Sequence, residues 1–233
     1  MNKILLINVL ISISTLTFGQ NRRVLDSFKQ GSQKGTGNCA SIAVIKASID
    51  RYGLGNVFKS VRDEKEKKYY VILKSGKELT LTFEEIKDAA KAARFVESNN
   101  TSLKLIKLYA DTCFAIIAKH IQVEQSFQTG PNNYSTFKEA LDDLNNGFST
   151  YTIAKSLGLE IERFKARPRE IREKSGAVVY NVYHAVYSTY GIYDEAGDKD
   201  GVALIEKFKF KRAGLKCGFL FCGPSGAFEI KTR

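Results

Sequence analysis

The loop-to-helix stretch at residues 33–49 constrains the fold of this chain more than any other segment. Residues 33–38 contain two glycines and end in Asn38, a residue type favoured at helix N-caps because its side chain accepts a hydrogen bond from the first turn. After Cys39, isoleucines recur at helical spacing at positions 42, 45 and 49, and glycines at 53 and 55 supply a stop. We therefore expect a loop that becomes a helix at Cys39 and buries one apolar face.

A cysteine at the first position of a helix is a candidate nucleophile. The positive end of the helix dipole stabilises a thiolate, so we expect the pKa of Cys39 to fall below that of a free thiol. Gln33 lies six residues upstream across the two glycines, so its amide can fold back beside the sulfur. Gln33 and the backbone amide of Cys39 could then donate hydrogen bonds to an oxygen that gains negative charge during acyl transfer.

The chain has two histidines, and His184 is the candidate general base. It lies in a β-rich run, where a strand would hold the imidazole rigidly. The alternative is a core histidine in a tyrosine-lined sheet. We interpret His120 as a surface or half-buried residue of a long helix. Glu124 is spaced to share its helix face, but two ligands do not make a metal site, so we expect neither a metal nor a cofactor.

These residues together resemble a known family. Gln33, two glycines and Cys39 at the start of a small-residue helix are similar to the papain-like cysteine peptidases, and most of all to the calpain catalytic core. His184 lies 145 residues after Cys39 and is followed by Ala185 and hydrophobic residues, as the catalytic histidine of that family is. The resemblance implies a papain-like two-lobed α+β fold, with Cys39 as thiolate nucleophile, His184 as general base and Gln33 as oxyanion donor.

Several positions depart from the family's pattern. Ala40 stands where an aromatic residue usually follows the nucleophile, and Asn38 stands where calpains have an acidic residue. The calcium-binding loops of calpains are not recognisable, so we infer no calcium dependence.

The third catalytic residue is not evident from the sequence. Calpains place Asn and then Pro-Trp after the strand that follows the histidine, but residues 204–209 contain no asparagine and the chain has no tryptophan. Asp200 and Glu206 are candidates for orienting the imidazole, because a carboxylate can replace an amide in this role, and Asp194 is a weaker candidate. A Cys–His dyad without a third residue stays open.

The remaining patterns predict an α+β protein whose helices precede most of its strands. Two capping boxes, Thr82–Glu85 and Thr136–Glu139, open helices. Helical patterns cover residues 82–94, 103–122, 136–147 and 150–157. Strand patterns cover residues 69–74, 78–82, 177–193, 202–211, 219–221 and 227–230, whereas residues 56–68 look like a charged connection. We place a helical lobe at about 20–165 and a sheet lobe at about 166–233, together one catalytic domain over 20–233.

Residues 1–19 have the features of a secretory signal peptide: a lysine near the start, an apolar run and small residues at the cleavage offsets. We therefore expect a secreted or periplasmic protein, with no membrane span in the mature chain. In an exported protein Cys217 and Cys222 could form a disulfide across a small loop, while Cys113 fits a buried thiol. The net charge of +11 is dispersed and no nucleic-acid motif is present, so we expect no nucleic-acid partner.

The function that these features favour is hydrolysis of peptide bonds in a peptide or protein substrate by an exported cysteine peptidase. Two alternatives remain at this stage. One is a secreted peptide-binding protein that kept the fold and lost efficient turnover. The other is a Cys–His amidase acting on cell-wall amide links. The sequence does not indicate an oligomeric state.

Overall fold

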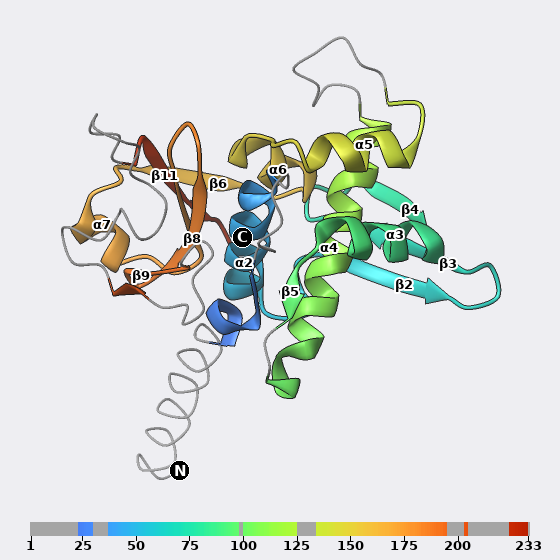
Figure 1. Cartoon of the computed structure of the whole chain (residues 1–233), viewed down its shortest axis with the longest axis horizontal. Coiled ribbons are helices and arrows are strands. Elements are labelled where there is room, and N and C mark those ends of the chain that lie inside the picture. Colours follow the sequence, from blue (N-terminus) through green and yellow to red (C-terminus); the bar gives the residue numbers. More distant parts are fainter. Residues whose placement is uncertain are drawn as a thin grey trace, which may run out of the picture.

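The computed structural model describes residues 23–29, 37–97, 100–124, 134–194, 203–204 and 224–232. Helices and antiparallel sheets make up this part of the chain, which confirms the α+β class (Figure 1). Several predicted features lie outside the described residues and stay predictions: the signal peptide at 1–19, Gln33, Asp200, Glu206, Cys217 and Cys222.

The longer helices form where the sequence predicts them. They are α2 (Cys39–Tyr52), α3 (Phe83–Ala93), α4 (Lys104–Val123), α5 (Phe137–Leu144) and α6 (Thr150–Ser156). Both predicted capping boxes are present at the starts of α3 and α5. Residues 23–27 are also helical, and the 3₁₀ turn η1 (Thr101–Leu103) leads into α4. A further short helix, α7 (Pro168–Arg172), begins at a proline, which suits the first helical turn because that turn needs no N–H donor.

The strands form three antiparallel sheets. A two-residue pair joins β1 (Phe28–Lys29) to β5 (Val96–Glu97). A three-stranded sheet has the order β2 (Lys59–Asp63), β3 (Lys68–Ile72) and β4 (Glu78–Thr82). The expectation of a charged connection over 56–68 is therefore wrong for β2. Four of its five residues are exposed, so this strand carries no apolar alternation that could reveal it.

The largest sheet has six strands in the order β10-β9-β8-β7-β11-β6. Its members are β6 (Ile161–Phe164), β7 (Ala177–Tyr180), β8 (Ala185–Thr189), β9 (Ile192–Tyr193), β10 (Ala203–Leu204) and β11 (Gly226–Ile230). Strand β6 precedes residue 166, so this sheet recruits one strand from the segment expected to be helical. The turn at residues 181–184 joins β7 to β8 and pairs Tyr180 with Ala185.

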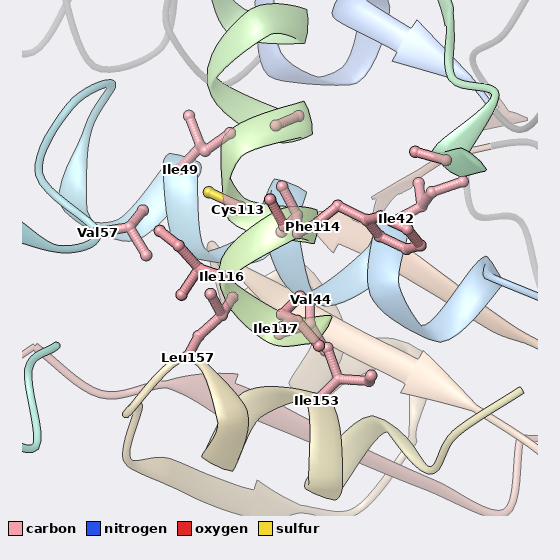
Figure 2. Close-up of a cluster of buried hydrophobic side chains, with 14 of the residues drawn as sticks. Ile42, Val44, Ile49, Val57, Cys113, Phe114, Ile116, Ile117, Ile153 and Leu157 are labelled. Carbon is pink, nitrogen blue, oxygen red and sulfur yellow. The ribbon is translucent and has the colours of Figure 1, made fainter. Parts of the chain in front are cut away.

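Helix α2 lies at the centre of the molecule, between β8 of the six-stranded sheet and helices α4 and α6 (Figure 1). All ten residues from Ala40 to Ile49 are buried. Figure 2 shows the contact on the helical side, where Ile42 and Val44 of α2 meet Phe114 and Ile117 of α4 and the side chain of Ile153 from α6. Cys113 belongs to this core and is fully buried, as predicted.

A lysine lies inside this apolar core. The Lys46 side chain is fully buried, and its Nζ atom lies 2.7 Å from Asp194 Oδ2 and donates to the Leu25 carbonyl at 2.8 Å. Lys46 Nζ also lies 4.9 Å from the centre of the Phe28 ring. Through these contacts the Lys46 ammonium group connects α2 to two other segments. One is the N-terminal segment at 23–29, through Leu25, and the other is the end of β9, through Asp194.

No helix in the described segments has the length and apolar character that crossing a bilayer requires.

Replacing Lys46 by methionine should destabilise the protein, because the buried Asp194 carboxylate would lose its ion-pair partner. We expect the free energy of unfolding in urea to fall by about 3–5 kcal/mol. The matched control is Lys87→Met, which removes one partner of an exposed pair with Glu84 and should cost less than about 1 kcal/mol. Equal, small losses in both variants would contradict a structural role for the buried pair.

Candidate active site

Cys39 and His184 line the same surface pocket, which has a volume of about 760 Å³. One wall is the segment from Asn146 to Tyr151, which joins α5 to α6, and the opposite wall is the β7–β8 turn. Cys39 enters from the N-terminus of α2, and His184 enters from the end of the turn. Cys39 and His184, which the sequence predicts to act together, are distant in the chain but line the same cavity.

Asn38 occupies the N-cap position of α2, but its side chain does not cap the helix. Its amide group instead donates to the Ala93 carbonyl at 2.8 Å and to Asn145 Oδ1 at 3.4 Å. The expectation of a capping side chain is thus wrong. The reason is that the last turn of α3 has carbonyls without helical partners, and the buried Asn38 amide satisfies one of them.

Gly37 holds the start of α2 against the pocket wall. Its N–H donates to the Asn145 carbonyl, and a Cβ added at this position would lie 3.0 Å from the backbone carbonyl of Asn146. That distance is shorter than most real Cβ contacts, so a larger residue here would push the two backbones apart by a few tenths of an ångström. The close approach fixes Cys39 beside the segment that follows α5.

His184 is the last residue before β8, whereas the sequence indicated a position within a strand. Its backbone is nevertheless held firmly. Asn181 Oδ1 accepts hydrogen bonds from the N–H groups of both Tyr183 and His184, each at 2.8 Å, and the Asn181 N–H donates to the His184 carbonyl at 2.9 Å. Side-chain bonds of this kind allow an asparagine to organise a tight turn. Asn181 therefore supplies the rigidity that a strand was expected to provide.

The electrostatics of the two side chains differ from the expectation. Backbone amides of Ala185, Ala40 and Cys39 lower the pKa of the Cys39 thiol, but burial outweighs them and raises that pKa above its ordinary value. The prediction of a lowered thiol pKa is therefore wrong for this structure. Burial also lowers the pKa of His184, because an imidazolium loses hydration in the pocket wall. Both side chains are consequently neutral near pH 7.

The amide of Ala185 links the two halves of the pocket, because it acts on the Cys39 sulfur and directly follows His184. The Nε2 atom of His184 is buried and has no hydrogen-bond partner among the described residues. Asp194, a weaker candidate for orienting the imidazole, instead forms the ion pair with Lys46. The stronger candidates, Asp200 and Glu206, lie outside the described residues, as does Gln33.

His120 has a structural role. It is buried, its Nδ1 atom lies 2.7 Å from the Ser156 carbonyl, and burial lowers its pKa. No group of three or more His, Cys, Asp or Glu side chains that could hold a metal ion occurs among the described residues.

Asn181, Tyr151 and Arg163 are among the pocket residues that the sequence patterns did not indicate. Only Asn181 had a local signal, since an asparagine two and three residues before the amides that it binds is a common turn pattern. Tyr151 of α6 and Arg163 of β6 meet in a contact between segments that are distant in the chain, which local sequence patterns do not reveal.

Comparisons of the chain with protein-family models, with curated proteins and with solved structures find no match.

Replacing Asn181 by alanine should loosen the turn that carries His184. The variant loses two hydrogen bonds to buried or half-buried amides, so we expect the free energy of unfolding to fall by about 2 kcal/mol. Asn181→Asp keeps an acceptor at the same position and should retain most of this stability. Urea unfolding of both variants checks the prediction, and equal losses in the two would show that the side-chain acceptor is not what holds the turn.

The reactivity of Cys39 should reflect a raised pKa. We expect its alkylation by iodoacetamide to keep accelerating above pH 8.5, where a free cysteine begins to level off, because only the thiolate reacts. Mass spectrometry of the peptide that contains Cys39 gives the rate, and glutathione serves as the reference thiol. A rate that is high and constant from pH 6 to 8 would instead reveal a thiolate–imidazolium pair and contradict the burial argument.

Proposed function

We propose that this protein is a hydrolase of papain-like type that cleaves peptide bonds, with Cys39 as nucleophile and His184 as general base. The observation that carries the proposal is the presence of both side chains in the lining of one pocket, with the amide of Ala185 acting on the Cys39 sulfur. The cysteine at a helix start and the histidine before an antiparallel strand support the resemblance to papain-like peptidases.

The proposed reaction starts from a neutral pair. His184 has a lowered pKa, so it is unprotonated and able to accept the thiol proton as the Cys39 sulfur attacks the substrate carbonyl. The backbone amide of Cys39, in the first turn of α2, can donate to the carbonyl oxygen as it becomes negative. The imidazolium then protonates the leaving amine, which departs and leaves a thioester on Cys39.

Water completes the cycle. His184 removes a proton from a water molecule, the resulting hydroxide attacks the thioester carbonyl, and the carboxylic acid product leaves as the sulfur regains its proton from the imidazolium. Every proton that His184 accepts is returned within one turnover, so the reaction needs no metal or redox cofactor to balance.

A second candidate is a peptide-binding protein with little turnover. Two observations favour it: burial raises the pKa of the Cys39 thiol, and His184 Nε2 has no orienting partner among the described residues. Both features would slow the formation of the thiolate, while the pocket would still be able to hold a peptide.

Turnover by wild-type protein and three variants separates these candidates. We expect cleavage of casein or of a peptide library by the wild type, and a loss of at least about a thousandfold in kcat/KM for Cys39→Ser and for His184→Ala. The matched control is Cys113→Ala, which changes a buried thiol outside the pocket and should keep its activity.

Three outcomes would contradict the proposal. Cleavage that survives Cys39→Ser would exclude the assigned nucleophile. Binding of peptides without cleavage would favour the second candidate. Cleavage of peptidoglycan fragments but of no peptide would move the assignment to a cell-wall amidase with the same Cys–His chemistry.

A further inference from the structure

The pocket that contains Cys39 and His184 carries one permanent charge on its described side chains, that of Arg163. His184 is the other basic side chain among the described lining residues, and its lowered pKa leaves it neutral near pH 7. No aspartate or glutamate is among the described lining residues. The described residues therefore give this pocket a net positive charge.

Arg163 lies at the edge of the six-stranded sheet. It is the third residue of β6, the edge strand of the six-stranded sheet, and its side chain is exposed. The charges on neighbouring positions are paired: Glu162 lies 3.6 Å from Lys231, and Glu229 lies 2.6 Å from Lys174. Within the described part of the chain, no carboxylate forms such a pair with Arg163.

An aromatic ring supports the guanidinium group. The Arg163 Cζ atom lies 5.6 Å from the centre of the Tyr151 ring, a distance that allows a cation–π contact. The N–H groups of an arginine lie along the edge of the guanidinium plane, where they can donate two parallel hydrogen bonds to a carboxylate. A cation–π contact at this distance can orient the Arg163 side chain before a ligand arrives.

The opposite wall is apolar and exposed. Val182 and Tyr183, at the tip of the β7–β8 turn, keep 79% and 74% of their surface accessible. Across the pocket, Tyr151 keeps 51%. Large apolar side chains that line a pocket and face solvent can gain free energy by covering a ligand. The pocket thus has one cation, Arg163, and exposed apolar side chains at its rim.

We propose that the substrate of this site carries a carboxylate close to the bond that is cleaved, and that Arg163 binds it. This inference rests on the proposed function, because it assigns the acidic group to the substrate of the Cys39–His184 pair. The carboxylate has two sources: an aspartate or glutamate side chain within a peptide, or the free C-terminus of a peptide. Arg163 is a specificity-determining residue in this scheme and takes no part in the proton transfers.

Peptide binding to full-length Cys39→Ser protein tests the inference without turnover. Fluorescence anisotropy would compare matched peptides that carry glutamate, glutamine or lysine at one position, and peptides with a free or an amidated C-terminus. We expect the glutamate peptide, or the peptide with the free C-terminus, to bind about tenfold more tightly than its neutral partner. A difference between the glutamate and glutamine peptides would identify a side-chain carboxylate. A difference between the free and amidated peptides would identify the C-terminal carboxylate.

Two further substitutions in the same background locate the effect. Arg163→Gln should abolish the preference for the acidic peptide, and Arg163→Lys should retain part of it, because lysine keeps the charge without the fork geometry. The matched control is Arg169→Gln on α7, where the side chain is 92% exposed and pairs with Glu173 outside the pocket. This control removes the same charge and should leave the preference unchanged.

The outcomes separate this inference from the proposed function. Equal binding of acidic and neutral peptides, or a preference that survives Arg163→Gln, would overturn the role of Arg163 even if the wild type cleaves peptides. The wild type could instead cleave no peptide while its preference for acidic peptides depends on Arg163. That result would support binding of a carboxylate by Arg163 and would contradict the proposed hydrolase function. A lack of binding to every peptide would overturn the inference.

Discussion

Burial of helix α2 between the six-stranded sheet and helices α4 and α6 is the interaction on which the rest of the structure depends. The helix is held against the sheet at both ends. At its start, the Cys39 sulfur lies within reach of the Ala185 amide, and in its last turn Asp50 accepts a hydrogen bond from the Gly176 N–H at 2.7 Å. Because an α-helix rises by a fixed 1.5 Å per residue, these two contacts set where Cys39 stands relative to His184.

The same burial that positions the candidate pair also opposes its ionisation. Amides at the helix start favour the Cys39 thiolate, but the loss of hydration in the pocket wall favours the thiol more strongly. His184 responds to the same loss by favouring its neutral form. For the proposed reaction, these two directions favour transfer of the proton during attack over a pre-formed ion pair.

Local sequence patterns predicted the helices of this protein well and its strands less well. The capping boxes at Thr82 and Thr136 are present because they depend on residues three positions apart. Strand β2 was missed because it is exposed along most of its length and is held by pairing with β3. Asn38 was expected to cap α2, but its partner is the Ala93 carbonyl, 55 residues away, and no local pattern contains that contact.

The sequence by itself determined that a helix begins at Cys39, that His184 lies in a β-rich run and that the chain is α+β, because these features depend on neighbouring residues and on the apolar period. Only the tertiary structure decided that Cys39 and His184 share a pocket, that Asn181 holds the histidine and that Arg163 lines the same cavity. The tertiary structure also decided that the pKa of Cys39 is raised and that the pKa of His184 is lowered. The physical reason is that burial and long-range contacts arise only when distant segments pack together, and a side chain's hydration then follows from its neighbours in space.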